Sequence, residues 1–191
     1  MPLPFKKVDP DLPDNRQAVF VELLMRDNNM LTQCLNSMQK SIDTGHIEPL
    51  SADTWKPINP KRLWYIPVFP VTQPNKKKVR VIYDSSASYK GNSLNRELLQ
   101  GSNVNNALRS VLTRFRNGEV GFCADMEAIF YAFALLDDDK DFTRFFWWKD
   151  NYPNREVTEF RANFHVFGNK SSPALANVGF RYAVDVSDCS I

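Results

Sequence analysis

Residues 63–84 read LWYIPVFPVTQPNKKKVRVIYD, two β-type runs on either side of a lysine-rich turn. The runs 63–73 and 78–84 are rich in β-branched and aromatic residues, and the proline and asparagine between them favour a turn. The pattern predicts a β-hairpin with lysines 76–78 at its tip and Arg80 on its return strand. Such a tip is either a solvated turn or a phosphate-binding element, because lysine supplies a point charge and arginine a planar fork.

The composition is that of a globular protein. The chain has 191 residues, of which 43% are hydrophobic and 13% aromatic, enough for one domain or two small lobes. No apolar run approaches the roughly 20 residues of a membrane span, and the start MPLPFKKVDP lacks the apolar core of a signal peptide. The three cysteines are too far apart for a zinc site or a disulfide framework. We therefore expect no membrane partner and an intracellular, reducing compartment.

The charges are unevenly distributed along the chain. Residues 56–116 carry 12 Lys/Arg against 2 acids, a net charge of +10. Residues 119–159 carry 10 acids against 4 Lys/Arg, a net charge of −6. This asymmetry fits either two solvated faces of opposite sign or a polyanion-binding surface beside a cation site.

Outside the hairpin, the sequence predicts a proline-rich extended arm and alternating helices and strands. Asp14 is a plausible N-cap, and apolar residues at helical spacing continue to Gly45, with Asp-Asn-Asn at 27–29 splitting the run into two helices. Further helices are expected over 104–115, 129–135 and 171–184, and strands over 120–125, 142–148 and 156–168.

The stretch 121–133, GFCADMEAIFYAF, places Asp125 at the end of an expected buried strand. Mg²⁺ prefers hard oxygen ligands, and nucleotide sites often hold it with one or two carboxylates and the substrate phosphates. Asp125 is therefore either a magnesium ligand or an N-cap of the following helical turn.

The stretch 165–177, HVFGNKSSPALAN, is a strand-to-helix turn that could also approach a ligand. Gly168 frees the backbone for close approach, and Pro173 favours a helix start with Ser171 or Ser172 as its cap. His165 lacks a cysteine or serine partner at a useful spacing, so we interpret it as structural.

Taken together in their order along the chain, these motifs identify a protein family more specifically than any one of them alone. The chain resembles the reverse transcriptase of BEL/Pao-type long-terminal-repeat retrotransposons over about residues 2–181. The resemblance rests on LPDNR, GHIEP, WYIPVFPV, KVRVIYDSSA, NSLNRELLQGSNVNNAL, VLTRFR, ADMEAIFYAF, DFTRFFWWKD and FHVFGNKSSPALAN. It implies an α+β fold, with a right-hand polymerase fingers subdomain over 1–116, a truncated palm over 117–191, and no thumb.

The resemblance also implies roles for individual residues. Asp125 would be the catalytic aspartate that binds Mg²⁺ with the backbone carbonyl of Met126. Phe130 would sense the 2′ position of the sugar. The nucleotide-binding residues would be Lys76, Lys77, Lys78, Arg80, Phe130, Gly168 and Lys170, and the template/primer-binding residues Ser172 and Pro173. The implied reaction is attack of a primer 3′-hydroxyl on a deoxynucleoside triphosphate, with an RNA or DNA template-primer as partner.

The chain departs from the family pattern in three places. Val68-Phe69 stands where relatives carry two histidines, and Ala128-Ile129 where they carry glutamine and methionine. The tail RYAVDVSDCSI has no Tyr-x-Asp-Asp motif, and the rest of the palm, the thumb and the RNase H region of a parent polyprotein are missing. The chain alone is therefore expected to be inactive. It is either a segment of a working polymerase or a decayed remnant that binds nucleic acid weakly. An unrelated α+β interaction protein is the third reading.

Overall fold

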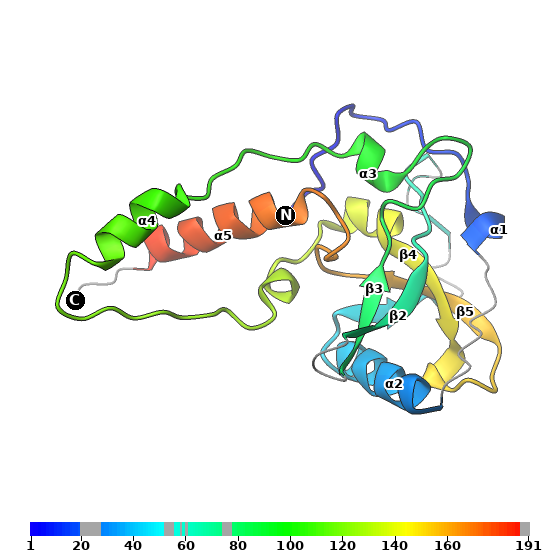
Figure 1. Cartoon of the computed structure of the whole chain (residues 1–191). Coiled ribbons are helices and arrows are strands. Elements are labelled where there is room, and N and C mark those ends of the chain that lie inside the picture. Colours follow the sequence, from blue (N-terminus) through cyan, green and yellow to red (C-terminus); the bar gives the residue numbers. More distant parts are fainter. Residues whose placement is uncertain (20–27, 52–55, 58, 60, 74–77, 188–191) are drawn as a thin grey trace.

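The computed structural model describes residues 1–19, 28–51, 56–57, 59, 61–73 and 78–187 (Figure 1). It confirms a mixed α+β protein with small antiparallel sheets. The elements in chain order are α1 (Arg16–Val19), α2 (Asn28–Asp43), β1 (Ile47–Pro49), β2 (Val68–Gln73), β3 (Lys78–Tyr83), α3 (Leu94–Glu97), α4 (Leu108–Phe115), the 3-10 helices η1 (Ile129–Ala132) and η2 (Asp137–Thr143), β4 (Arg144–Trp148), η3 (Lys149–Asn151), β5 (Val157–Ala162) and α5 (Ser172–Val186).

The central sheet has three antiparallel strands in the order β1-β5-β4. Phe160 in the middle strand pairs with Phe145 on one side and with Pro49 on the other. All five residues of β4 are buried. A strand that is covered on both faces needs no polar alternation, which explains the continuous run Phe-Phe-Trp-Trp.

The expected hairpin forms the second sheet, and its prediction is confirmed. Val68 pairs with Tyr83 at one end and Gln73 with Lys78 at the other. Residues 74–77, with Lys76 and Lys77 of the predicted tip, lie outside the described part of the chain, whereas Lys78 belongs to β3 rather than to the tip. Helix α2 packs against β3 (Figure 1), and the side-chain carbonyl of Gln33 accepts a hydrogen bond from the Val79 amide at 3.2 Å.

A buried ion-pair network joins the central sheet to the segment that leads into the hairpin. The Arg144 guanidinium, 1% exposed, donates to Asp141 at 2.8 Å and to Glu159 at 3.3 Å. The Tyr65 hydroxyl donates to the same Glu159 carboxylate at 2.7 Å. The Ile66 amide donates to the Arg144 carbonyl at 2.7 Å, so the chain runs beside β4 before it enters β2.

The N-terminal arm is extended, as predicted, and it packs onto the body. The Leu3 side chain is 5% exposed within the hydrophobic core, and its amide donates to the buried Asp139 carboxylate at 2.7 Å. Asp14 accepts a hydrogen bond from the Arg16 amide at 2.9 Å at the start of α1. Helix α2 is followed by Gly45 with φ +70°, the left-handed conformation that glycine adopts at helix ends.

One expected element is wrong, and others are shorter than predicted. Residues 120–125 form no strand, and Val120 and Phe122 are each 87% exposed. A strand needs a neighbour for its backbone groups, and no described segment pairs with this one. The helix expected over 129–135 is only the single 3-10 helix η1.

The bounds of several elements also differ from the predicted ones. Strand β5 stops at Ala162, and α4 begins at Leu108, inside the predicted ranges. In addition, η2 includes Phe142 and Thr143, which were expected to begin the strand 142–148. Strand β1 was not predicted, because three residues carry no periodicity to detect.

Helices α4 and α5 extend away from the body, and the segment after α4 returns along the same extension (Figure 1). Helix α5 begins with Ser171 at its N-cap and Pro173 in its first turn, as the sequence predicts. Among the helices that the structure describes, none has the length and apolar character needed to cross a membrane.

Replacing Arg144 with leucine should lower the free energy of unfolding by roughly 3–5 kcal/mol, because Asp141 and Glu159 would keep buried charges without this partner. Urea unfolding followed by tryptophan fluorescence measures the effect. Lys149→Leu is the matched control, since the Lys149–Glu156 pair is largely exposed and should contribute little. Equal shifts for the two variants would contradict the prediction.

Candidate functional site

A cavity of about 550 Å³ lies between β3, α2 and the segment that follows Asp125. Its size is typical of small-molecule sites. Its polar and charged lining groups come from Ser37, Ser41, Arg80 and Asp125. Its apolar lining is supplied by Met38, Val79, Val81, Ile82, Tyr83, Met126, Ala128, Ile129, Phe130, Tyr131, Phe164 and Phe167. The cavity therefore combines one cation and one carboxylate with an aromatic wall.

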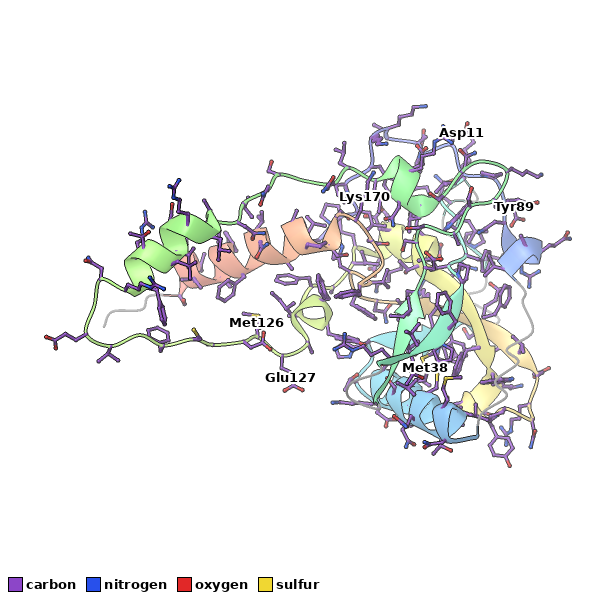
Figure 2. All side chains as sticks on the ribbon, in the orientation of Figure 1. Asp11, Met38, Tyr89, Met126, Glu127 and Lys170 are labelled. Atoms are coloured by element: carbon purple, nitrogen blue, oxygen red, sulfur yellow. The ribbon has the colours of Figure 1, made fainter. Side chains whose placement is uncertain are left out.

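Asp125 reaches this cavity on an irregular segment rather than on a strand. Met126 beside it is 42% exposed, and the Glu127 carboxylate projects into open space (Figure 2). Among the described residues, the Asp125 carboxylate has no hydrogen-bond or ion-pair partner. It is free to contact a ligand.

The turn after Asp125 is fixed by Ala128, whose φ of +56° is left-handed. The Tyr131 amide donates to the Ala128 carbonyl at 2.9 Å, which closes the turn of η1. Because this turn carries Phe130, it sets the position of that ring in the cavity. Neither Asp125 nor its neighbours cap a helix with a side chain, so the predicted N-cap alternative for Asp125 is wrong.

Aromatic contacts hold the cavity wall in place. The Phe130 ring meets the Phe167 ring edge-on, with centroids 5.1 Å apart. The Tyr131 ring stacks on Phe164 with centroids 4.3 Å apart, and the His46 ring contacts both of them, 4.5 Å from Tyr131 and 6.0 Å from Phe164. Phe164 is 3% exposed, so these contacts tie the segment 128–131 to the core.

Gly168 packs against the end of β3 rather than facing the cavity. A Cβ placed on Gly168 would lie 1.8 Å from the Tyr83 carbonyl oxygen. The Asn95 side chain then bridges the two sides of this contact, donating to the Gly168 carbonyl at 2.9 Å and accepting from the Lys170 amide at 2.8 Å. The Ser85 hydroxyl donates to the Asn169 side chain at 2.5 Å. Gly168 thus positions the segment that carries Phe167.

A second, polar pocket of about 310 Å³ lies where α5 begins. It is lined by Lys170 and by the amide side chains of Gln100, Asn103, Asn105 and Asn177, with Gly101, Ser102, Val104, Pro173 and Ala174. Burial, together with nearby Lys6, lowers the pKa of Lys170, while Glu97 acts in the opposite direction. Lys170 lies near the start of α5, away from Met126 (Figure 2).

The residues predicted from sequence to form one site are distributed over two pockets and the packing between them. Arg80, Asp125, Met126 and Phe130 line the larger cavity together. Lys170 and Pro173 line the polar pocket. The buried Ser172 hydroxyl donates to the Val166 carbonyl at 2.8 Å, so it serves the start of α5. Lys78 begins β3, next to the cavity-lining Val79. Lys76 and Lys77 lie outside the described residues.

His165 has the structural role that the sequence predicts. It is 1% exposed, and its Nε2 lies 3.1 Å from the Met1 carbonyl oxygen. A carbonyl can only accept, so Nε2 carries the proton in this contact. Burial is the main cause that lowers the pKa of His165, and it keeps the ring neutral.

Sequence reasoning missed the contribution of α2 and of Asn95 to the site. Ser37 and Met38 face the cavity from α2, whose sequence pattern shows only an amphipathic helix. Asn95 lies in a polar loop of the sequence with no feature that marks it as a bridge. Both contributions depend on contacts between segments far apart in the chain.

Within the described residues, no cluster of three or more His, Cys, Asp or Glu side chains is arranged to hold a metal ion. No protein-family model matches the chain, and no curated protein matches its sequence.

Gly168→Ala should lower the free energy of unfolding by roughly 1–3 kcal/mol or more, because the added methyl group overlaps the Tyr83 carbonyl. Thermal unfolding by circular dichroism measures the loss. Gly118→Ala is the matched control, since the nearest atom to its Cβ is the Val120 carbonyl oxygen at 3.7 Å. An equally small effect at both glycines would show that the contact with Tyr83 is not tight.

Proposed function

We propose that this chain carries the nucleotide-binding part of an RNA-directed DNA polymerase, a reverse transcriptase of the BEL/Pao type. The observation that supports the proposal is the shared cavity of Arg80, Asp125, Met126 and Phe130. These residues come from two segments some distance apart in the sequence. By the resemblance, Arg80 and Phe130 match nucleotide-binding positions of the family, and Asp125 and Met126 match its metal-binding positions. In this proposal residues 1–116 belong to the fingers and 117–191 to part of the palm.

The chemistry of the cavity fits a deoxynucleoside triphosphate. Arg80 offers guanidinium donors to phosphate oxygens, and it lies at the exposed side of β3. The Phe130 ring, held edge-on by Phe167, supplies a flat apolar surface against the sugar. The cavity volume of about 550 Å³ is in the range of small-molecule sites.

A magnesium ion would complete the charge balance of this site. The Asp125 carboxylate and the Met126 carbonyl are hard oxygen donors, the type that Mg²⁺ prefers, and Asp125 has no competing partner among the described residues. Bound there with the triphosphate, Mg²⁺ would neutralise phosphate charge. Asp125 would orient the triphosphate for attack by the primer 3′-hydroxyl on the α-phosphorus, with pyrophosphate as the leaving group.

Among the described residues that line the cavity, Asp125 is the only acid. Two-metal nucleotidyl transfer uses more than one carboxylate to hold its ions. We therefore propose that the described residues bind nucleotide, and that polymerisation requires further carboxylates from outside them.

A second function, binding of a nucleic-acid strand without catalysis, is favoured by the polar pocket at the start of α5. Lys170 and four amide side chains converge there. Amides and lysine contact phosphate and sugar oxygens without reading sequence. This function needs neither the cavity nor a metal.

Asp125→Asn should weaken Mg²⁺-dependent binding of a deoxynucleoside triphosphate by about tenfold to a hundredfold, the loss expected for one charged contact. Titration calorimetry with and without Mg²⁺ measures the affinity. Glu127→Gln is the matched control, because Glu127 is two residues away and does not line the cavity. If the wild-type chain binds no nucleotide, or if Asp125→Asn binds as tightly as wild type, the proposal fails.

Lys170→Gln should weaken binding of a primer-template and reduce by about one the slope of log affinity against log salt, as expected for one lost phosphate contact. Fluorescence anisotropy at several salt concentrations gives this slope. Lys40→Gln removes an exposed cation from α2 that lines neither pocket, so its slope should match wild type. Identical slopes for all three proteins would exclude the polar pocket as a phosphate-binding site.

A further inference from the structure

The extension formed by α4, the segment 116–128 and α5 exposes an unusual amount of apolar surface. Its exposed large apolar side chains are Leu108, Val111, Leu112, Phe115, Val120, Phe122, Met126, Val178, Phe180, Tyr182, Val184 and Val186. Most of the other residues of this type on the described surface are scattered over the body. A concentration of this kind marks an interaction surface.

Helix α5 shows the same feature in its sequence. From Ser172 to Val186 its only charged side chains are Arg181 and Asp185. Its exposed apolar residues are not confined to one stripe: Val178, Tyr182 and Val186 lie on one side of the helix, and Phe180 and Val184 lie on the opposite side. A helix that is apolar on several faces is normally covered by a partner.

The exposed area is large enough for a stable interface. Scaled by their exposed fractions, the twelve apolar side chains of the extension present on the order of 1,000 Å², against about 800 Å² per partner in a standard protein–protein interface. The extension alone could therefore form a specific contact.

The charges of the extension come in two complementary sets. Helix α4 and its end carry Arg109, Arg114 and Arg116, with no acid between residues 98 and 118. The returning segment 119–127 carries Glu119 and Glu127, besides Asp125, which lines the cavity, and it has no lysine or arginine. None of the three arginines and two glutamates has an ion-pair partner among the described residues, so both sets are available to another molecule.

We propose that the extension is a self-association surface, on which α4 of one copy packs against segment 119–127 of a second copy. In a two-fold symmetric dimer this contact occurs twice, and each occurrence pairs three arginines with two glutamates. A nucleic acid or an anionic membrane would match the arginines but would be repelled by the glutamates. A second copy satisfies both sets and covers the apolar residues between them.

Light scattering after gel filtration tests the proposal on the full chain. We expect a discrete dimer. A stable monomer at a chain concentration of about 100 µM would overturn the proposal, because specific interfaces of standard size have dissociation constants in the micromolar range or below. Broad, larger aggregates without a dimer would also overturn it, because they indicate unspecific apolar contact.

Charge reversal separates specific pairing from simple apolar association. The variant R109E/R114E/R116E and the variant E119R/E127R should each dimerise at least about 100-fold more weakly than wild type, because like charges then face each other. An equimolar mixture of the two variants should form a heterodimer, since both contacts are again complementary. Circular dichroism confirms that each variant is folded.

Two outcomes of this experiment contradict the proposal. A mixture of folded variants that stays monomeric would show that the charges do not pair between copies. A reversed α4 that keeps the dimer but no longer binds nucleic acid would identify α4 as a nucleic-acid surface instead. The control K149E/R155E reverses two exposed cations on the body and should dimerise like wild type.

Discussion

The buried guanidinium of Arg144 is the constraint on which the rest of the structure depends. It pairs with Asp141 of η2 and Glu159 of β5, and either buried carboxylate without a cation would cost several kcal/mol. Glu159 in turn accepts the Tyr65 hydroxyl and pairs with Arg16 at 2.6 Å. One network therefore fixes β4, β5, α1 and the chain that enters the hairpin. Burial and the Glu159 carboxylate together raise the pKa of Tyr65, which keeps its proton in this contact.

The candidate site depends on this framework through β3. Tyr83 at the end of β3 is buried against Phe145 of the central sheet, with ring centroids 5.5 Å apart. Its carbonyl is the surface against which Gly168 packs, and its ring lines the cavity with Arg80 from the same strand. The cavity thus joins rigid residues on β3 and α2 to Asp125, which is carried on a segment with few contacts. A site of this kind can adjust to a ligand on one side while the other side stays fixed.

Sequence reasoning located the elements whose pattern repeats within a few residues. The hairpin 63–84, the helix ending at Gly45, the strand Phe-Phe-Trp-Trp and the start of α5 at Ser172 were all predicted, because periodicity, turn residues and caps are local signals. It also named Arg80, Asp125 and Phe130, which the structure places in one cavity. The strand expected at 120–125 was wrong, since an apolar run shows only that a segment can be buried. Whether it becomes a strand depends on a neighbour that the run itself does not encode.

The sequence by itself determined the α+β class, the hairpin and the residue types capable of phosphate and metal chemistry, because those follow from side-chain chemistry and short-range spacing. Only the tertiary structure decided which of these residues meet. It placed Arg80 and Asp125 on the walls of one cavity, placed Lys170 in a separate polar pocket, and packed Gly168 against Tyr83. It also left the apolar side chains of α4 and α5 exposed, whereas their pattern predicts only burial somewhere. The physical reason is that contact between distant segments is set by the packing of the whole core and not by any one stretch of it.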